Sequence, residues 1–420
     1  MAVNIDSILK PFQRFGVHLG LERSEQLLAN LGNPHEQVPI IHVAGTNGKG
    51  SVCAYLSSIL TQAGYKVGRY TSPHLVDWME RICLNDQPIS VEALQSLLLQ
   101  VINAINAATE TPTQFEVITA AAWLYFAQSK VDIAVVEVGL GGRLDATNIC
   151  DRPLVSVITS ISREHWQQLG STLAEIAREK AGIIKPSCPV VVGQLPQEAE
   201  KVVRSRIAQL NCPAVWVEPA LELPTINDQR WATYQNIEYP LPNLGNIQLS
   251  NSAIAVSTIQ ILQQNGWKIT SEAISTGMKK TLWLGRLQWV EYGDFSLLID
   301  GAHNPAAAQA LRQYVDTLET PVTWVMGMLS TKDHADIFTA LLRSGDCLHL
   351  VPVPDHSSAD PIDLAALAQN TCPNLATCEA YLDLISALKA AERDRLVILC
   401  GSLYLVGHFL KSLPFPQKKG

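Results

Sequence analysis

The sequence of 420 residues lacks a surplus of positive charge. Its 31 lysines and arginines stand against 39 aspartates and glutamates, for a net charge of −8. This balance argues against an extended nucleic-acid-binding face and against a surface that binds anionic membranes. Charged residues are scarce overall, at 17 %, whereas hydrophobic residues make up 47 %, which excludes a mainly disordered protein. At about 150 residues per domain, the length predicts two or three domains.

Cysteine motifs and long apolar runs are also missing. The nine cysteines are odd in number and scattered without any Cys-x-x-Cys, so we expect free thiols in a reducing compartment rather than disulfides or a zinc site. The first ten residues include Asp6 and no apolar core, unlike a signal peptide. No uncharged apolar run reaches the roughly 18 residues of a membrane helix. These absences predict a cytoplasmic protein, and we expect a monomer that binds small molecules.

Short β-branched runs alternate with helical patterns along most of the chain, which predicts βα units and a largely parallel sheet. Residues 213–248 interrupt this rhythm with five prolines, so we expect an antiparallel appendage or an irregular excursion there. Alternation then resumes and continues past residues 285–293, which we interpret as a linker. The expected strands are Ile40–Val43, Ile133–Val138, Leu154–Thr159, Pro189–Val192, Leu297–Ile299, Val322–Met326, Cys347–Val351 and Leu396–Leu399.

The clearest single motif is HVAGTNGKGS at residues 42–51, between an expected strand and an expected helix. Its glycines let backbone N–H groups point at phosphate oxygens, and the helix N-terminus adds about half a positive charge. Lys49 would then hold the outer phosphates and the Ser51 hydroxyl would bind Mg²⁺. The strict P-loop spacing is not met, because Gly50 separates these two residues. A structural turn beside a surface lysine is the alternative.

Acidic and imidazole groups follow the next strands. Glu137 lies near the carboxyl end of a strand, at the sheet edge where open α/β sheets bind ligands, so it is a candidate Mg²⁺ ligand opposite Ser51. Glu164 and His165 follow the next strand and fall at the same edge, although an isolated histidine is more often a capping or surface residue. Lys180 ends a helix, and its spacing alone favours a cation that interacts with the helix dipole.

The second half of the chain carries a similar arrangement. Asp300 follows a strand, Gly301 permits a tight turn, and His303 comes two residues later, so Asp300 and His303 are candidates for either a functional or a structural role. Asn304 is expected to cap the following helix. We therefore expect an α/β protein in which a P-loop-containing, mostly parallel sheet ATPase domain of residues 1–285 precedes a smaller Rossmann-like α/β domain of residues 294–420.

Seven motifs occur in order over nearly the whole chain, and together they resemble one family. They are HVAGTNGKGS, YTSPHL, EVGLGGRLDATN, EKAGIIK, GRLQ, DGAHNP and GSLYLVG. The chain resembles folylpolyglutamate synthase/dihydrofolate synthase, which belongs to the wider Mur ligase family. The first domain would then hold the folate site and the second the glutamate-ligase functions. Mur enzymes of peptidoglycan synthesis carry a substrate domain ahead of the phosphate loop, whereas Lys49 arrives too early for one.

The resemblance implies an ATP-dependent ligase that joins L-glutamate to a pterin carboxylate. ATP would phosphorylate the carboxylate of dihydropteroate or a reduced folate to an acyl phosphate, which glutamate attacks, with release of ADP and phosphate. Such chemistry depends on metal ions and positioning. A related Mur-type ligase acting on another carboxylate, or a nucleotide-dependent binding module, is the alternative. His18 stands where bifunctional members often have Asp, which leaves the choice between the two folate substrates open.

The resemblance also implies roles for single residues. Family members carry a carbamylated lysine in the EKAGI motif, so a carbamate on Lys180 would make it an anionic Mg²⁺ ligand. The implied catalytic residues are Lys49, Lys180 and His303. The implied Mg²⁺ ligands are Ser51, Glu137, His165 and Lys180. The implied ATP contacts are Gly45, Thr46, Asn47, Gly48, Lys49, Gly50, Ser51, Asn251, Arg286 and Asp300. The implied folate contacts are Ser72, Pro73, Arg81 and Phe115.

Overall fold

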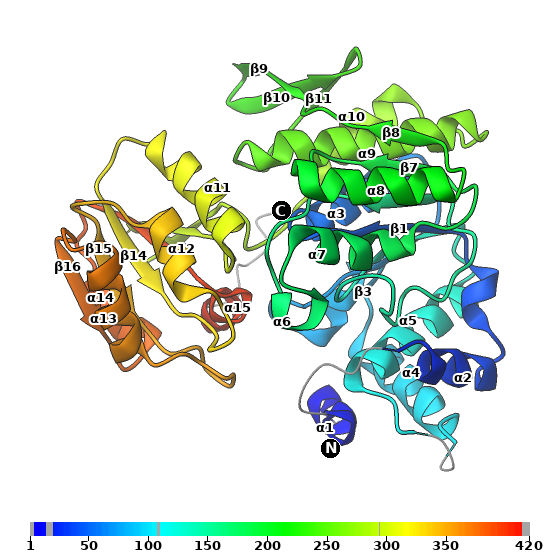
Figure 1. Cartoon of the computed structure of the whole chain (residues 1–420), viewed down its shortest axis with the longest axis horizontal. Coiled ribbons are helices and arrows are strands. Elements are labelled where there is room, and N and C mark those ends of the chain that lie inside the picture. The colour runs from blue at the N-terminus through cyan, green and yellow to red at the C-terminus, as the bar shows by residue number, and fades with distance from the viewer. Residues whose placement is uncertain (1–3, 14–19, 107–109, 294, 414–420) are drawn as a thin grey trace. The chain divides into compact units, whose positions relative to one another are not determined.

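The computed structural model describes residues 4–13, 20–106, 110–293 and 295–413, so His18, Asp294 and residues 414–420 lie outside the described residues (Figure 1). The chain forms two compact units. The first comprises Met1–Pro242 and Gln248–Leu282, and the second comprises Asn243–Ile247 and Trp283–Gly420. Among the described residues, no helix combines the length and the apolar character that a membrane crossing requires.

The first unit is built on an eight-stranded sheet of order β4-β3-β2-β5-β1-β6-β7-β8. Pairing is parallel from β2 to β8, and β3 and β4 add an antiparallel edge. The predicted mostly parallel sheet is therefore confirmed. The strands are β1 Ile40–Ala44, β2 Val67–Tyr70, β3 Ile82–Leu84, β4 Gln87–Pro88, β5 Ile133–Glu137, β6 Val155–Ile158, β7 Val190–Val192 and β8 Ala214–Trp216.

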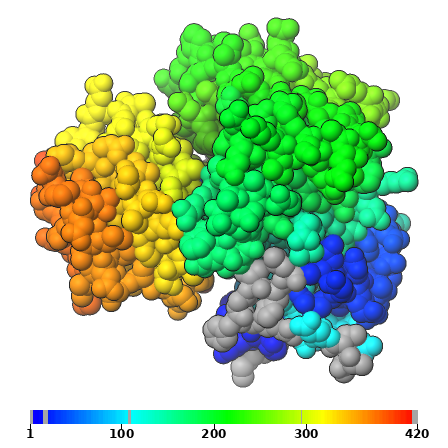
Figure 2. Space-filling view, viewed as in Figure 1, coloured from blue at the N-terminus to red at the C-terminus, as the bar shows by residue number. Residues whose placement is uncertain are grey.

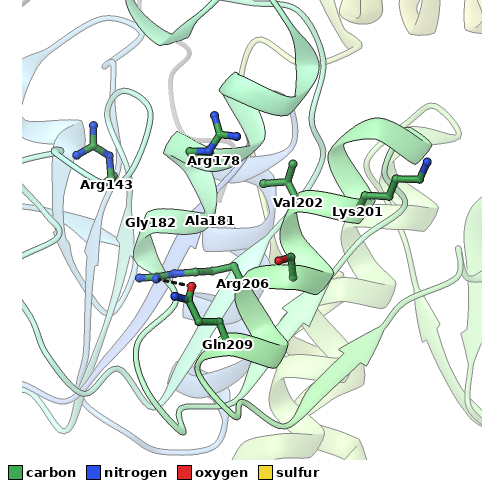
Figure 3. Close-up of a pocket in the computed structure, with 9 residues that line it drawn as sticks. Arg143, Arg178, Ala181, Gly182, Lys201, Val202, Arg206 and Gln209 are labelled. Atoms are coloured by element: carbon green, nitrogen blue, oxygen red, sulfur yellow. Dashed lines mark hydrogen bonds between the residues drawn. The ribbon is translucent and has the colours of Figure 1, made fainter.

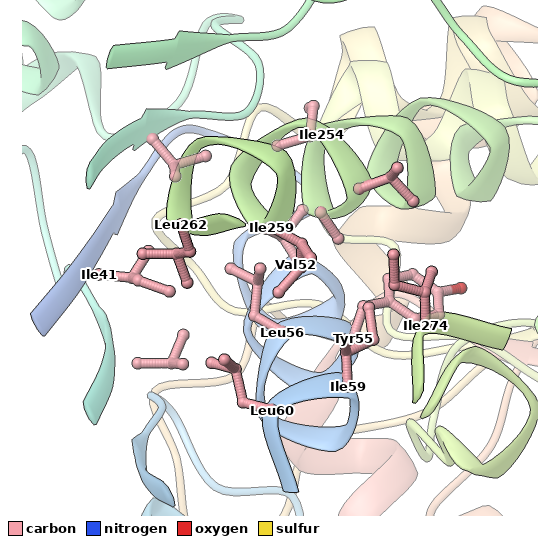
Figure 4. Packing of buried hydrophobic residues seen from close by; sticks show 14 of the residues in the cluster. Ile41, Val52, Tyr55, Leu56, Ile59, Leu60, Ile254, Ile259, Leu262 and Ile274 are labelled. Atoms are coloured by element: carbon pink, nitrogen blue, oxygen red, sulfur yellow. The ribbon is translucent and has the colours of Figure 1, made fainter. Parts of the chain in front are cut away.

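Helices cover both faces of this sheet because successive strand residues point to opposite sides. Ile41 packs with α3, α9 and α10 (Figure 4), whereas its neighbour Ile40 packs on the other face with α4 and α5. Helices α7 and α8 extend that second cover over β6 and β7. The helices are α1 Ile5–Leu9, α2 Glu22–Asn30, α3 Lys49–Gln62, α4 Val91–Asn103, α5 Gln114–Ser129, α6 Trp166–Leu169, α7 Leu173–Lys180, α8 Gln197–Gln209, α9 Ile247–Gln264 and α10 Ser271–Lys280.

Capping residues set where several of these helices begin. Thr113 accepts a hydrogen bond from the Glu116 N–H at the start of α5, and Thr172 does the same for Glu175 at the start of α7. In both pairs the glutamate also accepts from the cap residue's backbone, which completes a capping box. Helix α3 instead starts directly from the left-handed Gly48, so no cap side chain crowds its first turn.

The proline-rich stretch is only partly an appendage. Strands β9 Leu221–Ile226, β10 Gln229–Tyr234 and β11 Ile237–Pro240 form an antiparallel three-stranded sheet, which confirms the expected appendage. However, β8 lies at the start of the same stretch and pairs parallel with β7 of the main sheet. The expectation that strand–helix alternation stops at residue 213 is therefore wrong by one strand, because Pro213 stands before β8 rather than inside it.

The second unit holds a six-stranded sheet of order β12-β13-β17-β14-β15-β16, parallel except for β12. The strands are β12 Gln288–Tyr292, β13 Phe295–Ile299, β14 Val322–Met326, β15 Cys347–Leu350, β16 Thr377–Ala380 and β17 Leu396–Cys400, and the helices are α11 Pro305–Asp316, α12 His334–Leu341, α13 Pro361–Thr371, α14 Leu384–Ala390 and α15 Leu403–Ser412. Residues 285–293, which we interpreted as a linker, contain β12. The residues of this strand pair antiparallel with β13.

Candidate active site

Two glycines shape the loop between β1 and α3, residues 45–48, which we call the phosphate loop after its predicted role. At Gly45 an added Cβ would lie 1.9 Å from Thr159 Oγ1, and at Gly48 it would lie 2.3 Å from Asn251 Oδ1. Gly48 also has a φ of 88°, a left-handed conformation that other residues adopt at a cost. The loop thus requires glycine at both positions, and it brings the predicted nucleotide contact Asn251 of α9 against Gly48.

Hydroxyl groups that follow β6 hold this loop. Ser160 accepts hydrogen bonds from two loop N–H groups, at its carbonyl from Thr46 (2.7 Å) and at its Oγ from Asn47 (3.0 Å). Thr159 Oγ1 donates to the Asn47 carbonyl at 2.7 Å. Sequence reasoning missed both residues, although their place directly after a parallel strand was a usable signal. The N–H groups of Thr46 and Asn47 therefore already have hydrogen-bond acceptors. The backbone N–H groups that can donate to a ligand are those in the first turn of α3, which begins at Lys49.

Lys49 and Glu137 meet at the end of β5. Glu137 is buried and pairs in register with Val43 of β1, which places its carboxylate beside the loop. Lys49 Nζ lies 4.0 Å from Glu137 Oε1 and donates to the Thr46 carbonyl at 3.0 Å. The other carboxylate oxygen, Oε2, accepts from the Ser72 N–H at 3.2 Å. One carboxylate thus connects the phosphate loop with the YTSPHL segment.

Lys180 lies at the end of α7 and is only 5 % exposed. Its Nζ donates a 2.7 Å hydrogen bond to the Gly45 carbonyl. Burial, and secondly the charge of Lys49, lower the pKa of Lys180 to about 7, against partial opposition from Glu164 and Asp145. Lys180 lies in the last turn of α7, as its spacing predicted, but its side chain is buried and contacts the phosphate loop, which the interpretation as a helix-dipole cation does not account for.

Glu164 and His165 follow Thr159 and Ser160 at the same sheet edge. The Glu164 side chain is buried, while His165 is 45 % exposed and has left-handed backbone geometry with a φ of 50°. His165 Nε2 lies 3.9 Å from Glu164 Oε1. Within the described ranges, no group of three or more His, Cys, Asp or Glu side chains is arranged to hold a metal ion. The structure thus pairs His165 with Glu164.

A buried polar chain lies behind the loop, and sequence reasoning missed it. Thr147 Oγ1 donates to Asp145 Oδ1 at 2.6 Å and lies 2.9 Å from His42 Nε2. Burial, and then the charge of Lys185, lower the pKa of His42 to about 3, so this imidazole is neutral. Because its hydroxyl proton goes to Asp145, Thr147 accepts from His42. Burial raises the pKa of Asp145, against hydrogen bonds led by Thr147.

The YTSPHL segment forms a compact aromatic and cationic group. Arg81 is 8 % exposed, donates from Nε to His74 Nδ1 at 3.0 Å, and stacks its guanidinium 4.4 Å from the Trp78 ring centre. The His74 and Trp78 rings are 4.6 Å apart. Ser72 and Arg81 are linked through a neighbour, because the Thr71 N–H donates to the Arg81 carbonyl at 3.0 Å. The Ser72–Pro73 peptide bond, two residues after the end of β2, is cis. Sequence reasoning missed His74, which lies within the quoted motif, and Trp78, which lies three residues after it.

Phe115 lies at the start of α5 against the loop that follows β5. A Cβ added to Gly139 would lie 2.3 Å from Phe115 Cζ, and the Tyr70 ring is 6.2 Å away. The next residue, Glu116, accepts hydrogen bonds of 3.0 and 3.1 Å from Arg23 Nε. These contacts place Phe115, an implied folate contact, beside the glycine-rich GLGGRLDATN segment.

The end of β13 gathers three predicted residues of the second unit. Asp300 is buried and accepts from the N–H groups of Leu287 (2.9 Å) and Ala302 (2.8 Å). Burial raises the pKa of Asp300, and the charge of Arg286 is the largest opposing effect. His303 Nδ1 lies 2.7 Å from the Gly301 carbonyl. Arg286, Asp300 and His303 thus form one cluster, organised by the turn after β13.

Asn304 caps a helix, whereas Asn251 belongs to a buried polar group. Asn304 Oδ1 accepts from the Ala307 N–H at 2.9 Å, so the expected cap of α11 is confirmed. Asn251 Nδ2 donates to Gln248 Oε1 at 3.2 Å, and the Tyr55 hydroxyl donates to the same oxygen at 3.1 Å. Gln248 is therefore a further buried polar residue behind Gly48.

Comparison with known proteins assigns the chain to a family. The model of the Mur ligase middle domain matches residues 43–259, and that of the C-terminal domain of dihydrofolate synthetase matches residues 286–412. The chain is 35 % identical to "Probable dihydrofolate synthetase" of Schizosaccharomyces pombe, over 94 % of this chain and 99 % of the relative. It is 34 % identical to "Dihydrofolate synthase/folylpolyglutamate synthase" of Bacillus subtilis, over 95 % and 96 %. The chain belongs to the dihydrofolate synthase/folylpolyglutamate synthase family.

Solved structures of the family have the same fold. Escherichia coli FolC in complex with DHPP and ADP is 30 % identical, with a TM-score of 0.82, over 96 % of this chain and 95 % of that one. Folylpolyglutamate synthase of Mycobacterium tuberculosis complexed with ADP is 28 % identical, with a TM-score of 0.86, over 98 % of both chains. The predicted α/β fold is therefore confirmed, and so is the prediction that the chain is a ligase of this folate family.

Proposed function

We propose that the chain forms an amide between L-glutamate and the carboxylate of dihydropteroate, of a reduced folate, or of both. A carboxylate oxygen attacks the γ-phosphorus of ATP, the bond to the bridging oxygen breaks, and ADP leaves. The glutamate amine then attacks the acyl phosphate, loses a proton, and phosphate departs from the tetrahedral intermediate. The observation that carries this proposal is the double contact of Glu137, which lies 4.0 Å from Lys49 and accepts from Ser72.

The nucleotide is assigned to the phosphate loop and α3. The N–H groups at the start of α3, the helix dipole and Lys49 together favour the phosphates. Asn251 is packed against Gly48 and so borders this loop. The proposed ATP contacts in the first unit are Gly45, Thr46, Asn47, Gly48, Lys49, Gly50, Ser51 and Asn251. The backbone N–H groups of Thr46 and Asn47 already donate to Ser160. We therefore propose that these two residues shape the loop, and that the N–H groups of the residues after them donate to the phosphates.

The second unit supplies the remaining proposed contacts. Arg286 and Asp300 are assigned to ATP, and His303 to catalysis close to ATP and glutamate. Asp300 organises the turn by accepting two backbone N–H groups, which leaves His303 held at the Gly301 carbonyl. Escherichia coli FolC and Mycobacterium tuberculosis folylpolyglutamate synthase, solved with ADP, support ATP as the co-substrate.

Mg²⁺ is the proposed metal ion, with Ser51, Glu137, His165 and a carbamate on Lys180 as ligands. The donor set fits in its chemistry, because hydroxyl and carboxylate oxygens are the ligands that Mg²⁺ prefers. When bound, the ion would neutralise charge on the phosphates. Glu137 and Ser51 are buried at the same sheet edge, and Glu137 already lies beside a cation.

Carbamylation of Lys180 follows from its environment. With a pKa of about 7, a substantial fraction of this amine is neutral near pH 7 and can attack carbon dioxide. A nitrogen–carbon bond forms, one carbon–oxygen π bond opens and the nitrogen loses a proton, so the neutral amine becomes an anionic carbamate; two protons are released in all when the starting group is the ammonium cation. Because Lys49 is the second cause of the lowered pKa, the anion would relieve the repulsion between the two lysines.

The acceptor is assigned to the surface formed by Ser72, Pro73, Arg81 and Phe115. To these we add His74 and Trp78, whose rings stack with the Arg81 guanidinium. A planar aromatic ligand can stack on such rings, and the guanidinium can bind a carboxylate or a ring acceptor. DHPP in the structure of the FolC relative supports a small-molecule acceptor of this type. A cytoplasmic location remains part of the proposal, supported by the nine free cysteines, which suit a reducing compartment. We also retain the expectation of a monomer.

The deciding experiment is ADP release from the purified chain with MgATP and glutamate, with dihydropteroate and tetrahydrofolate offered in parallel. Turnover with both acceptors identifies a bifunctional synthase, and turnover with one assigns the activity. Lys49→Ala should abolish turnover, while Lys268→Ala, which changes an exposed lysine, should not. Release of ADP that does not depend on glutamate would indicate a nucleotide-dependent module. A folded chain that binds ATP and turns over neither acceptor would contradict the folate proposal.

A further inference from the structure

A basic hollow lies between α7 and α8, and none of the residues assigned to ATP or the acceptor is among those that line it (Figure 3). We call it the basic groove and define it by four cations: Arg143, Arg178, Lys201 and Arg206. Its volume is about 470 Å³, and no aspartate or glutamate is among its lining residues. The floor is small and apolar at Ala181 and Val202. Such a concentration of positive charge is unusual in a chain whose net charge is −8.

Helix dipoles account for only part of this charge. Arg178 and Arg206 lie in the last turns of α7 and α8, where cations interact favourably with the helix dipole. Lys201 lies in the first half of α8, and Arg143 lies on the loop after β5, so neither gains from a helix C-terminus. The dipole therefore does not explain why four cations from three segments face one hollow.

Nearby carboxylates neutralise little of the groove. Arg143 forms an ion pair with Glu179 Oε1, at 2.9 and 3.1 Å from two of its nitrogens. Within the part of the chain that the structure describes, Arg178, Lys201 and Arg206 form no ion pair, and the Arg206 guanidinium donates only to Gln209 Oε1 at 3.4 Å (Figure 3). Like charges repel one another, so an anion in the hollow would remove an unfavourable interaction.

We propose that the basic groove binds a flexible polyanion that carries several phosphate or carboxylate groups. The cations come from α7, α8 and the β5 loop, and a hollow of about 470 Å³ has room for several such groups. Arginine supplies paired N–H donors to phosphate or carboxylate, and the Ser205 hydroxyl and Gln209 amide add neutral hydrogen-bonding groups. The inference is independent of the proposed function, because its readout is binding.

The groove adjoins the segment that carries Lys180. The Arg143 N–H donates to the Glu179 carbonyl at 2.8 Å, and a Cβ added to Gly182 would lie 2.3 Å from Arg143 Cβ. A polyanion that competes with Glu179 for Arg143 would therefore act on the residues on either side of Lys180. Occupancy of the groove is in this way coupled to the end of α7.

The test is calorimetric titration of the full chain with sodium tripolyphosphate and, separately, with a triglutamate peptide, at 50 mM salt. We expect at least one probe to bind, Lys201→Gln/Arg206→Gln to weaken it by about tenfold or more, and Arg206→Gln alone to weaken it more than Arg204→Gln does. Arg204→Gln is the matched control for the single variant, because it removes one charge from the same helix, and Arg204 contacts Glu200 (2.6 Å) and stacks on Trp216 (3.8 Å). Binding should also weaken when salt is raised to 200 mM.

Three results would overturn the proposal. They are equal weakening by Arg204→Gln and by Arg206→Gln, loss of binding in Lys49→Ala alone, and failure of both probes to bind the wild-type chain. The first would indicate that binding depends on the net charge of the chain, and the second that the probe binds at the phosphate loop. Circular dichroism checks that the variants fold; if the double variant does not, the exposed Lys201→Gln carries the test. The probe that binds decides between phosphate and carboxylate as the recognised group.

Discussion

Lys180 Nζ donates a 2.7 Å hydrogen bond to the carbonyl oxygen of Gly45, so the end of α7 is tied to the first glycine of the phosphate loop. The two residues are 135 positions apart in the chain. A change in the chemical state of Lys180 must alter this contact, because an anionic carbamate cannot donate from an ammonium group. The lysine therefore connects loop geometry with the proposed metal site.

Replacement of Lys180 should strongly lower the activity, and an added carboxylate should partly restore it. We expect Lys180→Ala to lower glutamate-dependent ADP release by about 100-fold or more, since loss of a ligand should exceed the effect of losing an outer-shell partner. Added short carboxylates should restore part of the rate by replacing the carbamate. Lys185→Ala is the matched control, because Lys185 also donates to a backbone carbonyl, that of Asn148 at 3.3 Å. An active Lys180→Ala protein would return Lys180 to a structural role.

The lowered pKa of Lys180 also predicts a pH-dependent stability. Between about pH 7 and its ordinary value of 10.5, Lys180 is protonated in the unfolded chain but not in the folded one. The unfolded state then binds more protons, so folding is favoured as the pH rises, by about 1 kcal/mol per pH unit. Melting of wild type and Lys180→Met in bicarbonate-free buffer measures this. The difference between them should shift in favour of wild type from pH 7 to pH 9, and a constant difference would contradict the assigned pKa.

The hydroxyl of Thr159 should matter for the nucleotide step. Thr159→Val keeps the side-chain volume but removes the 2.7 Å hydrogen bond to the Asn47 carbonyl. That carbonyl retains the 3.0 Å hydrogen bond from Ser160 Oγ, so the cost is about 0.5–1.5 kcal/mol. We expect kcat/KM for ATP to fall by about two- to tenfold. Ser162→Ala is the control, because the buried Ser162 Oγ makes no hydrogen bond within the described residues. Equal effects of the two substitutions would show that the loop does not depend on Thr159.

Arg81 should affect the acceptor and not the nucleotide. Arg81→Ala removes the guanidinium that donates to His74 and stacks on Trp78, so KM for the pterin acceptor should rise by about tenfold or more. KM for ATP should change less than twofold. Steady-state kinetics with each substrate varied in turn measure the two constants. A rise in both by the same factor would point to a general structural effect.

Local order in the sequence was enough to predict the α/β class, the phosphate loop and the placement of Glu137. Gly45 follows a buried strand and Lys49 begins the next helix, and the carboxyl ends of parallel strands meet at one edge. Such patterns depend on neighbours within a few residues. The helix-capping role of Asn304 was predictable for the same reason, because its partner is three positions away.

Tertiary structure alone decided which distant groups meet and which are buried. Thr159 reaches Asn47 across 112 positions, and Lys180 reaches Gly45 across 135. Spacing cannot reveal such contacts, because they arise from the order in which strands are assembled. Burial then changes the chemistry, since removing an amine from water disfavours its charged form. The same assembly brings Arg143 of the β5 loop beside α7 and α8, which forms the basic groove.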